Sequence, residues 1–317
     1  MDLTAPLIKL YTMTVEVETD KGTAIATTPI QENIYDLVTN QEMPAIQRPG
    51  SGKLPGNSMP AVIGSPRVGK ATFTMEFRGT QGAAMNTALV ACLQACGCEQ
   101  SLQVYTPTGV HATQETVTLT FYENGLKKIL AGCMGEAEIY NNAEDGRILV
   151  DFDFTGRWTV PTDAGFPTIA NSTANPFIWG TPPGAFTFGG ESIKISTFRF
   201  KLGNEVAVYP DAGNYGIAYG KIVNRNPTLT IDPDMDLVES YDYYGLWLAG
   251  TIHIVSLILA DGTDKATLAI PRLQITDIAE SDRDNVMTLD LTGQCNFNVI
   301  DTGDDDWSLT IADDGVA

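Results

Sequence analysis

The chain has 317 residues, of which 43% are hydrophobic and 18% are charged, and its formal net charge is −20. This composition is typical of a folded protein, and the length suits two domains of about 150 residues each. A surface this acidic repels phosphate groups. Tight or sequence-specific nucleic-acid binding is therefore excluded, because it depends on clustered Lys and Arg.

The charge is uneven along the chain. Residues 1–165 carry 18 acids and 11 bases (−7), whereas residues 166–317 carry 21 and 8 (−13). Solubility alone accounts for such a surface. The alternative is that a like-charged wall keeps nucleic acid from adhering as it slides past.

In the first half, alternating residues predict a hairpin of two strands, Leu7–Val17 and Thr23–Pro29. Residues 41–66 are rich in Pro, Gly, Ser and Asn and predict a loop far longer than the usual connection. Further strands and one helix follow, the helix ending at Gly97. These elements are the strands Val68–Arg78, Thr113–Tyr122, Lys127–Tyr140 and Arg147–Val160 and the helix Gln81–Cys96.

The second half predicts a similar order of strand, loop, strand, helix and three strands. Asp232-Pro233-Asp234 has the composition of a helix start. The last 15 or so residues, with Asp304-Asp305-Asp306, indicate a short acidic extension. The predicted elements are the strands Glu191–Leu202, Lys221–Asp232, Thr251–Leu259, Lys265–Ile278 and Asn285–Val299, the loop Gly203–Gly216 and the helix Pro233–Leu248.

Two stretches of the chain end in the same short sequence motif, Asp-x-Thr-Gly. Asp153-Phe154-Thr155-Gly156 and Asp290-Leu291-Thr292-Gly293 each close a β-like hairpin, with an Ala-Glu pair (Ala143-Glu144, Ala279-Glu280) expected at its turn. Thr72–Glu76 and Thr228–Asp232 are a second pair of similar strands. The sequence therefore predicts a mainly β protein of two tandem β-sandwich or barrel domains, 1–165 and 166–317, each with one flanking helix.

Targeting and metal-binding signals are missing from the sequence. Residues 1–6 do not form a secretory signal, and the longest apolar run, 252–260, is far shorter than the roughly 20 residues of a membrane helix. Cys92 and Cys96 are four residues apart, as on a buried helical face, and His111 and His253 are isolated. The odd number of cysteines indicates folding in a reducing compartment. We expect no metal ion and no cofactor.

No catalytic motif is complete, so we expect no enzyme and assign no catalytic residue. Residues 64–71 resemble a phosphate loop but place Ala71 where a hydroxyl is needed, and they run into a strand. Asp151 and Asp153 fit a solvated strand face. The aromatic residues of 241–247 fit core or interface packing better than sugar binding, although a carbohydrate-binding or carbohydrate-hydrolysing β-sandwich stays open as an alternative.

Several segments resemble the tail tube proteins of long-tailed, siphovirus-like bacteriophages. Residues 125–135 followed by 147–156 resemble a hairpin of that family, and Gly203–Val206, Asn224–Pro227 and Ala269–Gln274 resemble its matching pieces. The resemblance implies a β unit with a flanking helix whose sheets join into rings, which stack into a tube. Two units in one chain imply a homotrimeric ring of six pseudo-equivalent units.

The same resemblance implies the partners and the location. The chain itself is the main partner, other tail proteins bind at the tube ends, and DNA passes to the host through an acidic bore without specific binding. The protein belongs to the virion and is assembled in the host cytoplasm. The long loop implies contacts to an adjoining ring, for which we name Arg48, Lys53, Leu54, Asn57 and Met59. A tail-tip or baseplate ring protein of the same fold is the nearest alternative.

Overall fold

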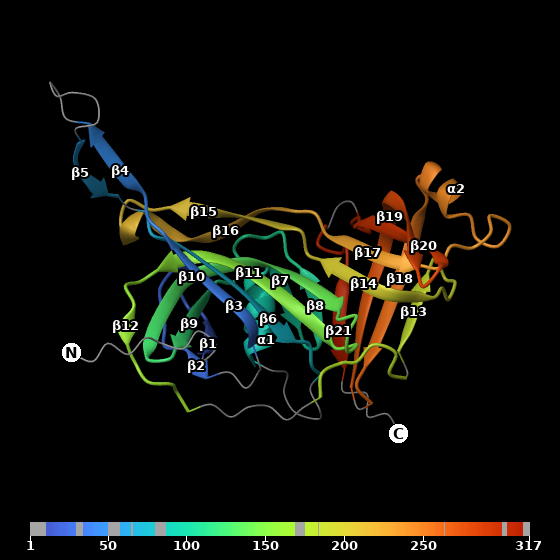
Figure 1. Ribbon diagram of the computed structural model, residues 1–317, viewed down its shortest axis with the longest axis horizontal. Coiled ribbons are helices and arrows are strands. Elements are labelled where there is room, and N and C mark those ends of the chain that lie inside the picture. The colour runs from blue at the N-terminus through green and yellow to red at the C-terminus, as the bar shows by residue number, and fades with distance from the viewer. Residues whose placement is uncertain are drawn as a thin grey trace.

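The computed structural model describes residues 11–29, 34–49, 58–64, 66–79, 87–168, 175–182, 184–262, 264–299 and 303–312. The molecule is elongated and mainly β, as predicted, with the first half of the chain at one end and the second half at the other (Figure 1). Only two α-helices and one short 3₁₀-helix occur among the described residues.

The elements of the first half are β1 (Tyr11–Val17), β2 (Thr28–Pro29), β3 (Ile34–Glu42), β4 (Ala45–Pro49), β5 (Ser58–Ile63), β6 (Val68–Glu76), α1 (Thr87–Ala95), β7 (Cys98–Ser101), β8 (Val104–Pro107), β9 (Val117–Glu123), β10 (Leu126–Asn141), β11 (Ile148–Trp158) and β12 (Thr162–Asp163). Those of the second half are β13 (Ala185–Phe188), β14 (Ile195–Lys201), β15 (Asn204–Pro210), η1 (Asn214–Gly216), β16 (Ile217–Arg225), β17 (Thr228–Pro233), α2 (Tyr243–Leu248), β18 (Ile252–Ala260), β19 (Lys265–Arg283), β20 (Val286–Cys295) and β21 (Ser308–Ala312).

One antiparallel sheet runs through both halves. Its strand order is β3-β6-β11-β10-β14-β17-β20-β19, and every neighbouring pair is hydrogen-bonded. The step from β10 to β14 is where the two halves meet, with Ile139 opposite Phe200. The sheet therefore has two outer strands, β3 at one end and β19 at the other.

The long strands β10 and β19 also belong to a second layer. The first part of β10 pairs with β9, which pairs with β1, and the first part of β19 pairs with β18 and β21. Each long strand is irregular where it changes layers, between Ala131 and Met134 and between Ile275 and Asp277. Such bulges bend a strand, which lets one strand serve two sheets.

The order of pairing is the same in the two halves. The first half follows β3-β6-β11-β10-β9-β1, and the second follows β14-β17-β20-β19-β18-β13. A two-stranded hairpin separates the first two strands in each case, β4–β5 in the first half and β15–β16 in the second. A helix follows the second strand in each case, α1 after β6 and α2 after β17.

The core lies between the layers and is rich in aromatic side chains. Phe73, Phe152 and Phe154 are at most 2% exposed, and their ring centroids are 5.5–5.8 Å apart. Strand β21 pairs with β19 of the second half and with β8 of the first half. Ile311 of this strand and the preceding Trp307 are buried. Burying large apolar side chains such as these stabilises the fold by roughly 1.5–3 kcal/mol each.

Several sequence predictions were wrong, and tertiary contacts explain the differences. The loop predicted at 41–66 and the loop predicted at 203–216 each contain a strand of a hairpin: Ala45 pairs with Ile63, and Asn204 pairs with Arg225. The positive φ of Gly203 (70°) allows the chain to turn there, and a Cβ atom at this position would collide with the Asn226 carbonyl.

The second helix and the C-terminal segment also differ from the predictions. Asp232 and Pro233 belong to β17 and not to a helix, and the Asp232 carboxylate accepts hydrogen bonds from the Ser196 and Thr197 amides of β14 at 2.8 and 2.6 Å. The helix begins much later, where Asp242 accepts a hydrogen bond from the Gly245 amide. The predicted acidic extension contains the buried strand β21 and is not a tail in its described part.

The two predicted closing hairpins occur as β10–β11 and β19–β20, but the positions predicted to correspond in the two stretches differ elsewhere. Ala279 and Glu280 lie within β19, and the turn falls at Asp284 and Asn285, which have positive φ values. Thr292 of β20 pairs with Thr230 of β17, and the equivalent Thr155 of β11 pairs with Lys70 of β6. In the structure, Thr230 therefore corresponds to Lys70. The similarity of Thr72–Glu76 to Thr228–Asp232 is therefore displaced by four residues from the structural correspondence.

A buried carboxylate holds the end of β6. Glu76 is 5% exposed and receives hydrogen bonds from Arg78, from the Tyr35 hydroxyl at 2.8 Å and from Arg147 at 2.9 Å. Burial raises the pKa of Glu76, but these hydrogen bonds outweigh it and leave the pKa below its ordinary value of 4.5. The charged form is therefore favoured in the folded protein, and its contribution to stability is lost as the pH falls below about 4.5.

We predict that Glu76→Gln lowers the free energy of unfolding at pH 7 by about 2–4 kcal/mol, because it removes the buried carboxylate that pairs with the Arg78 and Arg147 guanidinium groups. The variant should also lose less stability than the wild type on acidification. Urea unfolding at pH 7 and pH 4 measures both effects. Glu42→Gln is the control, since its ion pair with Lys70 is half-exposed at 3.5 Å and should change stability by less than about 1 kcal/mol. Equal effects of the two variants would contradict the prediction.

Candidate assembly surfaces

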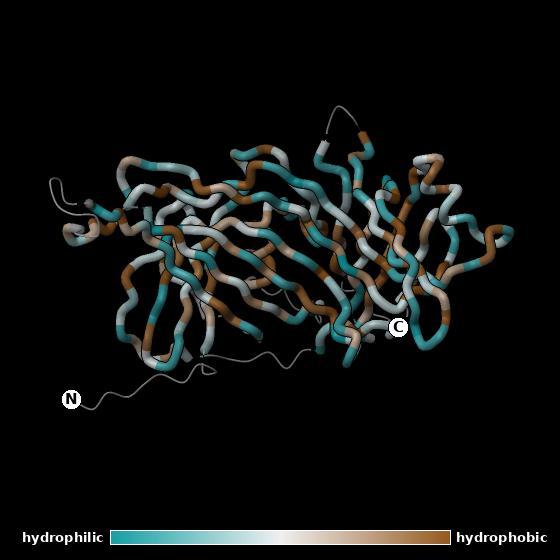
Figure 2. The backbone as a smooth tube through the Cα atoms, turned by 45° about the horizontal axis from the view of Figure 1, so that its top comes forward, coloured by the Kyte–Doolittle hydropathy of each residue, from teal (hydrophilic) through white to brown (hydrophobic). Residues whose placement is uncertain are grey.

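The eight-stranded sheet has one face on the core and one polar face. Along β11, Phe152 and Phe154 point to the core while Asp151 and Asp153 point away from it. Figure 2 shows hydrophilic and hydrophobic residues alternating along these strands. Following the registers places nine carboxylates and five cations on the polar face: Glu42, Glu76, Glu136, Glu138, Asp151, Asp153, Asp232, Asp277 and Asp290, against Lys70, Arg157, Arg199, Lys201 and Arg283.

The polar face is hollowed over β6, β11 and β10. A depression of about 450 Å³ lies there, lined by Thr72, Thr74, Glu136, Glu138 and Asp153 among others. Five of its lining residues are acidic, on the strands β3, β10 and β11, and Lys201 is the cation among them. Such an arrangement repels a polyanion and offers it no cluster of cations to bind.

The junction of the two halves combines backbone pairing with charge-assisted contacts. Arg199 of β14 pairs with Glu138 of β10 at 2.6 Å and lies over the Tyr140 ring. Asn141 donates to the Ser196 carbonyl and accepts from the Phe198 amide, both at 2.8 Å. The second half is thereby held to the exposed edge of β10 by strand addition.

Glu136 caps the end of this junction. Its carboxylate accepts hydrogen bonds from the Gly203 amide at 2.7 Å and from the Asn204 amide. Burial raises the pKa of Glu136 to about 7, although the two amides oppose the shift. The folded protein therefore binds a proton more readily than the unfolded chain between about pH 4.5 and pH 7.

Each end of the eight-stranded sheet has a free edge. Among the described residues, β3 pairs only with β6, and β19 from Thr276 to Arg283 pairs only with β20. The corresponding edge of β10 is the one that β14 occupies. Free edges expose unpaired backbone groups and are templates for pairing with another chain.

A hairpin projects beyond the free edge at β3. Strands β4 and β5 pair with each other and extend away from the body of the molecule (Figure 1). Of the residues predicted to contact an adjoining ring, Arg48 and Met59 are exposed and lie opposite each other in this hairpin. Lys53, Leu54 and Asn57 lie outside the described residues.

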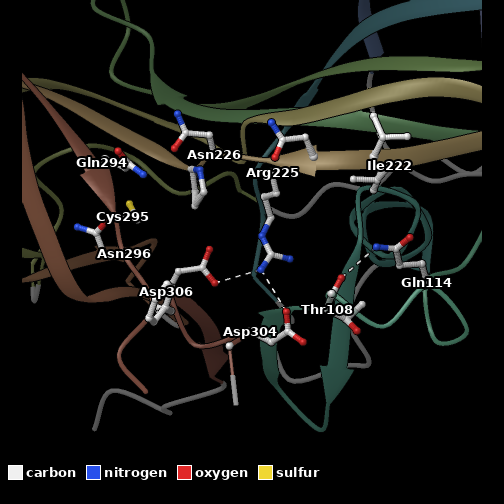
Figure 3. A pocket seen from close by; sticks show the side chains of 16 residues that line it. Thr108, Gln114, Ile222, Arg225, Asn226, Gln294, Cys295, Asn296, Asp304 and Asp306 are labelled. Atoms are coloured by element: carbon white, nitrogen blue, oxygen red, sulfur yellow. Dashed lines mark hydrogen bonds and ion pairs between the residues drawn. The ribbon is translucent and has the colours of Figure 1, made fainter. Parts of the chain in front are cut away.

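A hollow lies between the two halves. It has a volume of about 480 Å³, and Figure 3 shows Arg225, at the end of β16, reaching into it toward two aspartates. The guanidinium lies 3.2 Å from Asp304 and 3.3 Å from Asp306, so its charge is neutralised within the protein. This arrangement ties β16 to the segment before β21 within the second half and leaves Arg225 no unpaired charge for a ligand.

The remaining reactive side chains serve the fold. His111 contacts Gln114 and the Tyr219 hydroxyl, and His253 stacks on Phe188, where burial lowers its pKa. All five cysteines are buried thiols whose pKa values burial raises. The described residues hold no group of three or more His, Cys, Asp or Glu side chains that could bind a metal ion, and neither described α-helix is long and apolar enough to cross a membrane.

The free edges and the junction could not be found from sequence. Alternation identified β10, β14 and β19 as strands, but it says nothing about which strands become neighbours. The repeated Asp-x-Thr-Gly motif was the only usable signal. It aligns β11 with β20 and so indicates which strand edges of the two halves correspond.

The Glu136 geometry predicts a pH effect on stability. As the pH rises from 5 to 8, the wild type should lose stability relative to Glu136→Gln, because the folded protein holds the Glu136 proton more tightly than the unfolded chain does. Denaturant unfolding at several pH values measures the difference. Asp290→Asn, an exposed change on the same face, is the control and should follow the wild-type profile. Parallel profiles for the wild type and Glu136→Gln would contradict the prediction.

Comparison with known proteins supplies the family. The model of a phage tail tube protein family matches residues 42–295, which spans both halves of the structure, from the end of β3 to the end of β20. No curated protein matches the chain with significant similarity. Because the family match covers most of the sequence, the chain belongs to the phage tail tube protein family.

Proposed function

We propose that three copies of this chain close into a ring and that the rings stack into the tail tube of a siphovirus-like phage. The observation that carries this proposal is the pair of free edges on the eight-stranded sheet. If β19 of one copy pairs with β3 of the next, the ring repeats the internal pairing of β10 with β14. Head-to-tail interfaces of this kind form rings when the rotation closes.

The proposed ring treats the chain as two tandem units, residues 1–165 and 166–317. The identical order of strand pairing supports this division, as does the placement of one hairpin and one helix in each half. Three chains then contribute six pseudo-equivalent units. A ring with no free edge also removes the aggregation hazard that the edges of β3 and β19 create.

The dimensions of such a ring suit a channel. Three sheets of eight strands make a barrel of 24 strands, and strands about 4.8 Å apart and tilted by 35–45° give it a diameter of about 45–50 Å. Barrels of 16–18 strands already enclose an aqueous channel. The proposed barrel is therefore wide enough to enclose an open channel in addition to the side chains on its inner wall.

The polar face of the sheet lines the bore in this proposal. The strand registers place nine carboxylates and five cations on this face, a net charge of −4 per chain. DNA then passes toward the host without adhering, because the wall repels phosphates and lacks clustered cations. The role is structural and not enzymatic, the location is the virion tail, and assembly takes place in the host cytoplasm with other tail proteins bound at the tube ends.

The edge pairing predicts the effect of a single proline. Val38 of β3 is 62% exposed at the free edge, and Val38→Pro should prevent ring formation because proline disrupts strand addition at an edge. Val38→Thr keeps the backbone N–H and should assemble like the wild type. Negative-stain electron microscopy scores rings and tubes, and circular dichroism confirms that each variant is folded.

The outcomes of this experiment separate the alternatives. Three-fold rings stacked into hollow rods from the wild type support the tube, whereas rings that never stack point to a tail-tip or baseplate ring. Three-fold rings from folded Val38→Pro would contradict closure at β3. If Val38→Pro does not fold, Ser281→Pro with Ser281→Thr as its control tests the partner edge on β19.

The charge of the bore predicts how the tube treats DNA. Tubes of the double variant Asp153→Lys, Asp290→Lys should retain duplex DNA fragments at low salt and release them as salt is raised, since clustered cations bind phosphates in a salt-dependent way. Wild-type tubes should retain little. Co-sedimentation of tubes with labelled DNA measures the difference. The control is the double variant Leu102→Lys, Val110→Lys, which places two cations on the outside of the tube. Any DNA that this control retains should be retained whether the tube ends are open or closed, because it does not enter the bore.

A further inference from the structure

The hairpin β15–β16 is a cover for the first half of the chain. Gly220 packs against the backbone of Thr155 and Met134, and Tyr219 packs against Gly132 at the bend of β10. Arg157 donates hydrogen bonds to the Ile217 carbonyl at 3.1 Å and to the Gly22 carbonyl at 2.8 Å. The hairpin therefore lies across the place where β10 changes layers.

Three glycines make this contact close. A Cβ atom on Gly220 would lie 2.4 Å from the Thr155 carbonyl, one on Gly132 would lie 2.7 Å from the Tyr219 side chain, and one on Gly22 would lie 2.2 Å from the Ala218 carbonyl. Distances under 3 Å exclude any side chain at these positions. Residues 22–27 complete the cover, with the Ile25 amide donating to Thr118 of β9.

The corresponding place in the second half is uncovered and apolar. It lies beside the bend of β19, at the start of β18, where we define the β18 patch as Ile252 and Ile254. Their exposed fractions are 37% and 67%. At the equivalent positions of the first half, Thr118 and Thr120 of β9 are at most 2% exposed, and residues 22–27, which complete the cover there, hydrogen-bond to them.

In the part of the chain that the structure describes, the strands of the hairpin that corresponds to β15–β16 pair only with each other. Strands β4 and β5 carry the exposed apolar side chains Ile46 (53%), Met59 (43%), Val62 (43%) and Ile63 (57%). In the sequence, residues 43–63 contain two basic residues and no acid, whereas residues 166–317 carry a charge of −13. The hairpin and the second half are thus complementary in charge as well as in exposed apolar surface.

We propose that the β4–β5 hairpin of one copy covers the β18 patch of a second copy, the neighbour in the same ring. This inference rests on the proposed ring. The hairpin begins three residues after β3 ends, so pairing of β3 with the neighbour's β19 directs it over the neighbour's second half, as β14 directs β15–β16 over the first. The end of the hairpin with Arg48 and Met59 is then left to face an adjoining ring.

The proposal predicts that a charge in the β18 patch weakens assembly without harming the fold. Ile254→Asp should lower the assembled fraction about tenfold or more, because it removes an apolar contact that forms only between copies. Its melting temperature as a monomer should stay within a few degrees of the wild type, since Ile254 is already exposed there. Leu102→Asp is the matched control, because Leu102 is 91% exposed on the β7–β8 turn and should assemble normally.

A photo-crosslinking amino acid at position 254 identifies the occupant. After illumination of assembled wild-type-like rings, mass spectrometry should find residue 254 joined to a peptide within residues 45–63 of another copy. A crosslink to any other segment, or normal assembly of Ile254→Asp, would overturn the inference. If three-fold rings form but the crosslink lies elsewhere, only this inference fails; if the wild type forms no rings at all, the proposed function fails with it.

Discussion

The pairing of β10 with β14 is the constraint on which the rest of the structure depends. It joins the sheets of the two halves into one and leaves a free edge at each end, on β3 and β19. Glu136 fixes where the pairing stops, because its carboxylate binds the two amides at which the chain turns into β15. The same contact makes the junction sensitive to protonation near neutral pH.

Placing many carboxylates on one sheet face costs stability, and the structure offsets this cost locally. Arg199 neutralises Glu138 at the junction, and Arg283 pairs with Asp232 at 3.0 Å near the far end of the sheet. Glu76 and Glu136 are held by hydrogen bonds within the protein, whereas Asp153 and Asp290 are exposed on this face. A protein that needed only solubility could scatter its charges, so concentrating them on a hollowed face fits the proposed role of that face as the wall of a channel.

A hairpin that covers the bend of a long strand is part of both the fold and the proposed assembly. Within the chain, β15–β16 covers the bend of a long strand, and Gly132 and Gly220 allow it to approach closely. Between chains, the β4–β5 hairpin is proposed to cover the equivalent bend. The internal contact in a single copy thus supplies the geometry on which the proposed contact between copies is based.

The sequence by itself determined the β class, the strands β6, β10 and β11 and the likeness of the two closing hairpins, because alternation and turn residues are local signals. It placed the second helix ten residues too early, took β15 for a loop and took β21 for a tail. Those elements are decided by partners far away in the chain: Asp232 on the β14 amides, β16 beside β15, and β19 and β8 around β21. Only the tertiary structure could also show which strand edges stay free, because strand neighbours depend on the global packing and not on the pattern of any one segment.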